Sequence, residues 1–243
     1  YLAQAEVRRG DVVAVGFSGS FPALNIAVLA ALDTIGAHPL VISGVGASQW
    51  GANRFGLSWP EMEALLYRKG LIAARSKALS RGGIEDRALG LAPEDLALLD
   101  ALIAKSGLPA LTVRSLAESV DRRMALYDSL AEGQRIAAYI NVGGGASSVG
   151  VNRGKSVFAP GLTREPRVPK STADSVMGRF AARGVPLIHL TRISELAHEA
   201  GFAEKQASAP RVGEGGVYES RRPDRTLAMV LFSVLVALLV WGA

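Results

Sequence analysis

A strand–helix–strand unit near the start of the chain limits its fold most strongly. Residues 11–16 form a short apolar run typical of a buried strand, and residues 39–43 form a second one. Between them, residues 20–36 place apolar side chains at helical spacing, and Gly36 ends the pattern. A helix that connects two neighbouring strands in this way makes them parallel. The sequence therefore predicts an α/β fold with a mostly parallel sheet and helices on both faces.

The following residues continue this alternation of strands and helices. Two helices are expected to begin with a capping box, one pairing Ser58 with Glu61 and one pairing Ser115 with Glu118. The predicted elements are helices over 58–69, from 93 onward, 115–131, 172–183 and 193–200, and strands over 135–142 and 185–190.

The last eighteen residues differ from the rest of the chain. Residues 226–243 carry no charge, and fifteen of them are apolar. As a helix they would be about 27 Å long, close to the ~30 Å hydrocarbon core of a bilayer. Trp241 and three preceding arginines, at 221, 222 and 225, suit its two headgroup regions. We expect an α/β domain over 1–202, an irregular connector with a basic end over 203–225 and a transmembrane helix over 226–243; a buried core helix is the alternative.

Composition excludes several kinds of chemistry. The chain has no cysteine, which excludes disulfides, thiol catalysis and thiolate zinc sites. Its three histidines leave little room for a multi-histidine metal site, so no metal is predicted. The sequence identifies no cofactor.

Positive charge is concentrated in one proline-containing segment. Against a single Glu165, the segment holds five cations, which are Arg153, Lys155, Arg164, Arg167 and Lys170. A solvated basic loop explains them, and so does contact with a polyanion or with anionic lipid headgroups. Nucleic acid is not expected as a partner, because no interleaved aromatic residues or reader motif accompany the charges.

Small and hydroxyl residues follow the predicted strands. In a parallel sheet the ligand site lies outside the carboxyl ends of the strands, where such residues allow close approach of the backbone. Turn formation alone is the other explanation of the glycines. The candidate ligand-binding residues are Gly19, Ser20, Ser48, Gln49, Asn53, Asn141, Gly143, Gly144, Gly145 and Ser147.

The turn after the first strand has three interpretations. Ser20 is suited to cap the following helix, and the open N–H groups of that helix would bind an anion such as a carboxylate. Ser18 lies in a sequence that resembles a nucleophile elbow, with Ser20 in place of the usual glycine. His189 is then the candidate base, although a lone histidine on a strand is more often structural. These two are the candidate catalytic residues.

Two further segments contain chemically active groups. Residues 85–87 (Glu-Asp-Arg) form either an exposed salt-bridged loop or a contact to a cation or substrate. Residues 150–156 lack the spacing of a phosphate loop. A nucleotide-binding module that uses residues 143–150 remains a weaker alternative.

Several long motifs resemble the poly-gamma-glutamate system proteins. They extend over nearly the whole chain, in the family's order. The motifs are GDVVAVGFSGSFPALNIAVLAAL, VISGVGASQWGAN, SRGGIEDRALGL, AAYINVGGGASSVG and SVMGRFAARGVPLIHL.

The resemblance implies a bacterial membrane protein that acts with the machinery of poly-gamma-glutamate synthesis and export. Members look like a domain between an N-terminal and a C-terminal hydrophobic segment, so a second span is expected to be missing before Tyr1. The resemblance assigns no reaction. The expected function is a membrane-anchored accessory protein that binds the anionic polymer or scaffolds its synthase, with membrane lipid as a further partner. The alternative is a gamma-glutamyl hydrolase or transferase that uses Ser18 with His189.

The expected location is the bacterial cytoplasmic membrane, with a single C-terminal span in this chain. The arginines before residue 226 favour a cytoplasmic domain by the positive-inside tendency. A preceding anchor would override that preference, because the first helix usually sets the orientation. With such an anchor expected, an extracytoplasmic domain is slightly favoured.

Overall fold

The computed structural model describes residues 1–48, 52–54, 56–150, 157–166, 174–201, 229–234 and 238. The chain divides into two compact units, residues 1–200 and residues 201–243. The first unit is an α/β domain, as the sequence predicts, and it contains the six-stranded sheet.

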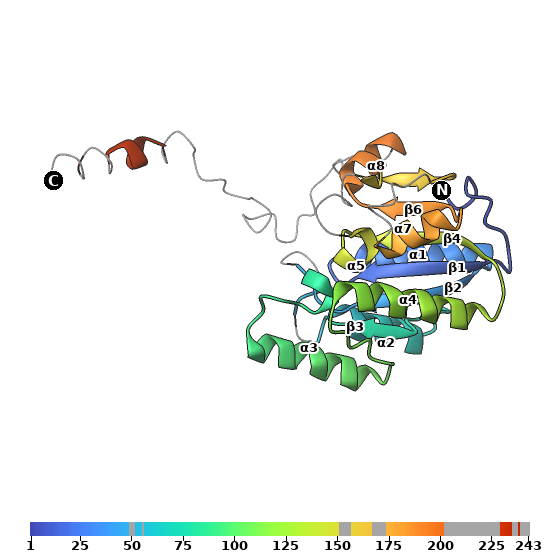
Figure 1. Ribbon diagram of the computed structural model, residues 1–243, viewed down its shortest axis with the longest axis horizontal. Helices are drawn as coiled ribbons and strands as arrows, with labels where there is room; N and C mark the ends of the chain where they lie inside the picture. The colour runs from blue at the N-terminus through green and yellow to red at the C-terminus, as the bar shows by residue number, and fades with distance from the viewer. Residues whose placement is uncertain are drawn as a thin grey trace. The chain divides into compact units, whose positions relative to one another are not determined.

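The sheet is parallel except at one edge (Figure 1). Its strands are β1 (Val12–Ser18), β2 (His38–Gly44), β3 (Ala78–Ser80), β4 (Ile136–Val142), β5 (Gly161–Thr163) and β6 (Leu187–Leu190). In space they follow the order β3-β2-β1-β4-β6-β5, and only β5 runs antiparallel, against β6.

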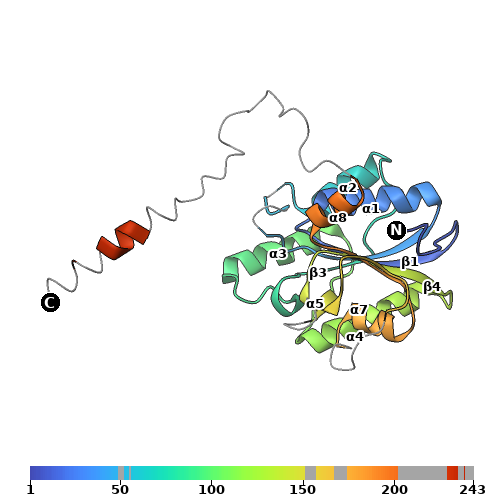
Figure 2. The ribbon, with the colours of Figure 1, turned by 90° about the horizontal axis from the view of Figure 1, so that it is seen from above.

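Helices cover both faces of this sheet (Figure 2). One face carries α1 (Pro22–Ile35), α2 (Trp59–Arg68) and α8 (Ile193–Glu199). The other carries α4 (Leu116–Ala131), α5 (Ala146–Val149) and α7 (Val176–Ala182). The helix α3 (Pro93–Ser106) lies beyond the β3 edge, and a 3₁₀ turn, η1 (Ile84–Asp86), precedes it.

Strand β1 reads as a continuous apolar run because both of its faces are buried. Val13 and Val15 belong to the core cluster that includes Leu32 of α1. Val12 and Ala14 belong to the opposite cluster, which includes residues of α4 and α7. Such burial on both faces is typical of strands in parallel sheets.

Of the two predicted capping boxes, the one at α2 is complete, and at α4 only the serine half forms, because the Glu118 carboxylate accepts the backbone N–H of Arg114 at 2.9 Å. Ser58 precedes α2, and its backbone N–H donates to the Glu61 carboxylate at 3.1 Å. Ser115 precedes α4, and its hydroxyl oxygen accepts a hydrogen bond from the backbone N–H of Glu118 at 3.2 Å. These contacts satisfy N–H groups that a helix start leaves open.

Four short elements were not predicted, namely β3, β5, α5 and η1. Each has only three or four residues, which is too short to show a periodic pattern of apolar side chains. Strand β3 matters most for function, because the chain after it forms part of the candidate site.

The predicted transmembrane helix is wrong. Among the described residues, the structure contains no helix long and apolar enough to cross a membrane. Within 226–243 the structure describes residues 229–234 and 238, which are helical. The predicted membrane location with a single span is corrected with it. The physical reason is that an uninterrupted apolar run permits a membrane span without requiring one. The predicted connector over 203–225 lies outside the described residues.

Candidate functional site

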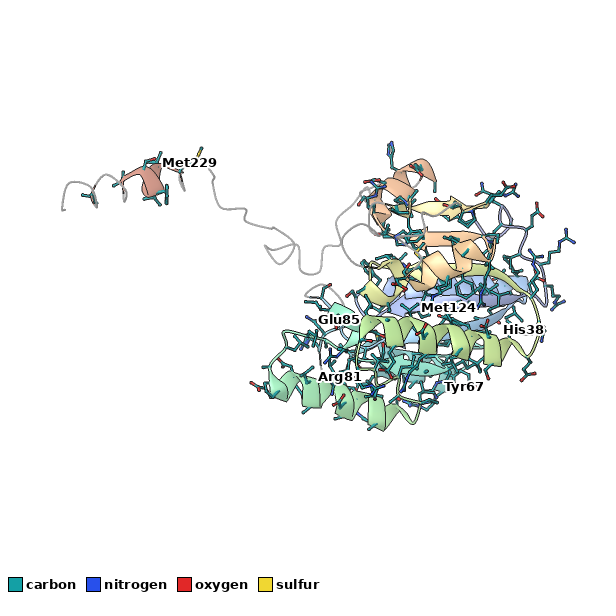
Figure 3. All side chains as sticks on the ribbon, in the orientation of Figure 1. His38, Tyr67, Arg81, Glu85, Met124 and Met229 are labelled. Carbon is teal, nitrogen blue, oxygen red and sulfur yellow. The ribbon has the colours of Figure 1, made fainter. Side chains whose placement is uncertain are left out.

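The order in which the chain adds strands to the sheet changes direction at β1. The chain builds β2 and β3 on one side of β1, and then β4 and β6 on the other. In open parallel sheets, ligands bind outside the carboxyl ends of the strands at such a point. Figure 3 shows Glu85, which follows β3, at this end of the sheet, and His38, the first residue of β2, at the opposite end. The candidate site therefore lies after Ser18 and Val142.

A cavity of about 830 Å³ opens at this place. It is lined by residues that follow β1, β2, β3 and β4, together with residues of α3. Among the predicted site residues, those that line it are Ser18, Ser20, Ser48, Asn53, Gly144 and Gly145. The structure thus brings the loops after the first three predicted strands together, as expected from the sequence.

Two glycines allow these loops to approach each other. The Gly19 N–H donates to the carbonyl of Gly44 at 2.9 Å, and a Cβ at Gly19 would lie 2.5 Å from the carbonyl oxygen of Val45. At Gly143, φ is +88°, and a Cβ would lie 2.9 Å from the ring of Phe21. Gly19 and Gly143 therefore bring the loops together, but neither of these predicted ligand-binding residues lines the cavity.

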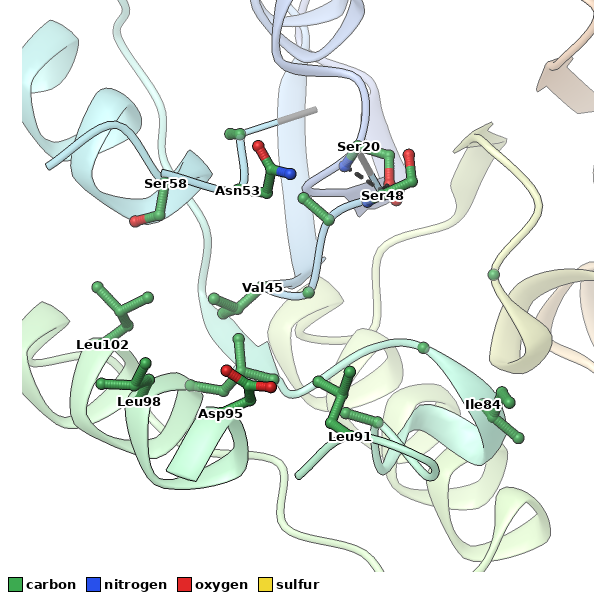
Figure 4. Close-up of a pocket in the computed structure, with 18 of the residues that line it drawn as sticks. Ser20, Val45, Ser48, Asn53, Ser58, Ile84, Leu91, Asp95, Leu98 and Leu102 are labelled. Atoms are coloured by element: carbon green, nitrogen blue, oxygen red, sulfur yellow. Dashed lines mark hydrogen bonds between the residues drawn. The ribbon is translucent and has the colours of Figure 1, made fainter. Parts of the chain in front are cut away.

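Serine side chains join the same loops. The Ser18 hydroxyl oxygen accepts the backbone N–H of Ser20 at 3.2 Å. The Ser20 hydroxyl oxygen accepts the backbone N–H of Ser48 at 2.9 Å (Figure 4). The residue before α1 is Phe21, and no side chain caps that helix. The prediction of Ser20 as its N-cap is therefore wrong, because Ser20 lies one residue too early and bonds to the β2 loop instead.

His189 is held by a different partner. It is buried on β6, and its Nδ1 lies 3.0 Å from the Nδ2 of Asn141 on β4, which also donates to the carbonyl of Gly143 at 2.5 Å. His189 does not line the cavity that Ser18 lines, and no hydrogen bond joins these two described residues. The pairing of Ser18 with His189 stays a prediction without a supporting contact.

Burial of His189 gives the domain a specific pH dependence. Desolvation, and then the positive charge of Arg192, lower the pKa of His189 from 6.5 to about 4. The unfolded chain therefore binds a proton that the folded domain does not, so the domain loses stability as the pH falls from above 6.5 toward 4. Between pH 7 and pH 5 this group should remove about 2 kcal/mol of unfolding free energy.

Urea unfolding at pH 7 and pH 5 measures this effect. The variant His189→Gln has no titrating group at this position and should lose about 2 kcal/mol less than the original chain over the same interval. An equal loss in both proteins would mean that His189 titrates normally in the folded domain.

The other predicted site residues do not line the cavity or lie outside the described residues. Ser147 is buried beside the cavity without lining it. Arg164 is exposed, and its guanidinium donates to the carbonyl of Gln4 at 2.7 Å and contacts Glu6 at 3.1 Å. Gln49, Arg153, Lys155, Arg167 and Lys170 lie outside the described residues. A polyanion contact of the basic segment stays a prediction.

One whole side of the cavity was not predicted from the sequence. Apolar side chains after β3 and on α3 form it, including Ile84, Leu91, Leu98 and Leu102 (Figure 4). Ile84 is 63% exposed and Leu91 is 46% exposed, although both are large and apolar. The available signal was the pair Gly82-Gly83, which marks a turn, but the three-residue β3 before it gave no strand pattern.

The cavity therefore has two chemically different sides.

Comparisons with protein-family models, with curated proteins and with solved structures gave no match. The resemblance to the poly-gamma-glutamate system proteins accordingly stays a prediction, and the site is interpreted from its own geometry. Within the described part of the chain, no group of three or more metal-ligating side chains is found.

The charged groups that line the cavity are of opposite sign. Arg54 is exposed and lies on the side of Asn53, while Asp95 belongs to α3 on the apolar side. The hydroxyl oxygens of Ser18 and Ser20 accept backbone bonds, so their hydrogens remain able to donate to a ligand oxygen. The arrangement suits an elongated ligand with oxygen atoms on one side and aliphatic carbon on the other.

Proposed function

We propose that the α/β domain is a binding module that holds a segment of a carboxylate-bearing polymer in the strand-end cavity. The resemblance implies γ-linked polyglutamate as this polymer, and an accessory or scaffolding role in its synthesis or export. The observation that carries the proposal is the convergence of four strand-end segments on one open cavity.

The chemistry of the polymer supports this assignment. Each γ-linked unit has a free carboxylate, an amide and two methylene groups in its main chain. Hydroxyl donors at Ser18 and Ser20 and the cation of Arg54 suit the oxygen atoms. The leucines of α3 suit the methylene groups, because apolar surface there is removed from water.

The contacts of Ser18 support binding more than bond cleavage. A serine nucleophile requires a base within about 2.6–3.2 Å of its hydroxyl. The Ser18 hydroxyl instead contacts the backbone N–H of Ser20, and the described histidine on β6 contacts Asn141. The hydrolase alternative therefore lacks an observation in its favour.

A cavity-filling variant tests the proposal. Gly145 lines the cavity, its backbone is extended, and a Cβ there would meet no atom within 4 Å. Gly145→Leu should therefore fold normally and occupy space that the ligand needs. Titration calorimetry of the full chain with a γ-linked glutamate decamer should show at least a tenfold loss of affinity. The control, Ala30→Leu, places the same leucine side chain at an exposed position of α1 that does not line the cavity.

Two results would contradict the proposal. One is the absence of measurable binding by the original chain, and the other is equal affinity in Gly145→Leu and Ala30→Leu. Trimming of the decamer during the titration, lost in Ser18→Ala, would support the hydrolase alternative instead.

A further inference from the structure

The loop that follows β3 presents apolar side chains to the cavity without burying them. We call residues 82–91 the rim loop. Gly83, Ile84, Ala88, Leu89 and Leu91 of this loop line the cavity, and Ile84, Leu89 and Leu91 are exposed. These three side chains therefore contribute little burial. The loop depends on its own backbone hydrogen bonds, such as the one from the Ala88 N–H to the Gly82 carbonyl at 2.8 Å, and on contacts from neighbouring elements.

The backbone of the rim loop is unfavourable for its sequence. Glu85, Asp86 and Ala88 have φ values of +53°, +61° and +55°, a region that residues with a Cβ rarely adopt. Each such residue stores energy and persists only where surrounding contacts hold it. Three of them within four positions indicate that contacts inside and around the loop hold its backbone.

The holding contact is a buried ion pair. Asp86 is 4% exposed and Arg123, on α4, is 3% exposed, and the Arg123 Nη2 lies 2.8 Å from the Asp86 Oδ2. The hydroxyls of Ser80 and Ser119 donate to the same carboxylate at 2.7 Å and 2.5 Å. Three residues of β3 and α4 thus bind one side chain of the rim loop.

Arg123 also ties the loop to the sheet. Its Nη2 donates to the Ser80 hydroxyl oxygen at 2.6 Å, and Ser80 is the last residue of β3. Arg123 itself does not line the cavity. Its hydrogen bonds to the rim loop go to Asp86, whose neighbours in the chain form the apolar rim.

We infer that Arg123 is a positioning residue of the ligand site: through Asp86 it holds the rim loop so that Ile84 and Leu89 face the aliphatic part of a bound chain. This inference rests on the proposed function. A preformed apolar rim avoids the ordering cost that a mobile loop would add on binding. The Asp86–Arg123 pair therefore raises the affinity of the site for ligands with methylene groups.

The experiment compares Arg123→Met with Leu187→Ala in the full chain. Leu187 is buried on β6 and does not line the cavity, so its truncation destabilises the domain by a separate route. At a temperature where both variants are folded, the γ-linked glutamate decamer should bind Arg123→Met at least tenfold more weakly than the original chain. Leu187→Ala should stay within twofold. Hydrogen exchange should show faster exchange in residues 82–91 only for Arg123→Met.

Ser119→Ala provides a second, milder variant that keeps the ion pair. It removes one donor to Asp86 and should weaken binding two- to fivefold, with a smaller rise in exchange of the rim loop. If Arg123→Met does not fold, decamer binding and hydrogen exchange of Ser119→Ala test the inference in its place.

The outcomes separate the inference from the proposed function. Binding by the original chain that falls equally in Arg123→Met and Leu187→Ala overturns the inference and leaves the proposed function standing. Unchanged exchange of residues 82–91 in Arg123→Met and Ser119→Ala also overturns it. If the original chain does not bind the decamer, the proposed function fails and the inference fails with it, whatever the exchange shows.

Discussion

Asp86→Ala is expected to lower the unfolding free energy of the domain by about 3–5 kcal/mol, the usual effect of removing one partner of a buried ion pair. The guanidinium of Arg123 would remain buried without the carboxylate that it contacts at 2.8 Å. In a domain of this size the melting temperature should fall by roughly 6–20 °C.

Two further variants separate charge from packing. The double variant Asp86→Asn with Arg123→Met removes both charges and should recover much of the loss, because it leaves no buried charge without a partner. The Asn amide oxygen can still accept from the Ser80 and Ser119 hydroxyls, and Asn tolerates the positive φ at this position. Asp100→Ala removes the half-exposed partner of Arg81 and should cost at most about 1 kcal/mol. Thermal and urea unfolding measure all of these, and similar losses for Asp86→Ala and Asp100→Ala would contradict the prediction.

Gly19→Ala should cost about 3 kcal/mol, at the upper end of the range for overpacking. The added Cβ would lie 2.5 Å from the carbonyl oxygen of Val45 and 3.2 Å from those of Gly44 and Gly46. All three contacts are with backbone atoms, which cannot move aside as the end of a flexible side chain can. The loops after β1 and β2 would have to separate, and the 2.9 Å hydrogen bond from Gly19 to Gly44 would be lost.

Gly144→Ala is the matched comparison for this effect. It adds the same methyl group in the loop after β4, where nothing lies within 4 Å of the added Cβ. Its unfolding free energy should therefore remain within about 0.5 kcal/mol of the original value. Equal stability of the two variants in urea would show that the turn after β1 adapts to a side chain.

The architecture was predictable where strands and helices are long. The apolar run that became β1 is buried on both faces, and the helical spacing before Gly36 marked α1 correctly. The short strands β3 and β5 gave no such signal, and the reversed direction of β5 depends on pairing with a strand more than twenty residues later. Local patterns do not contain that information.

The candidate site was predictable in part, for the same reason. Parallel strands carry their following loops to one end of the sheet, so Ser18, Ser48 and Gly144 were expected to meet, and they do. The role of Asp86 was missed, because its partner Arg123 lies 37 residues away on a helix whose charges otherwise suggest a solvated face. His189 was chosen for its chemistry, and its bond to Asn141 could not be inferred from the sequence.

The two edges of the sheet affect how the protein associates with itself. Unpaired edge strands are templates for aggregation, and natural proteins keep them short or cover them. Along β3, the N–H of Leu79 donates to Pro109 at 2.9 Å, and its carbonyl accepts from Leu111 at 2.7 Å, so the connection from α3 to α4 occupies that edge. At the other edge β5 has only three residues and runs against its neighbour. Among the described residues of the domain, neither edge presents a long strand to a second copy of the chain, which opposes edge-to-edge aggregation of the folded state at high concentration.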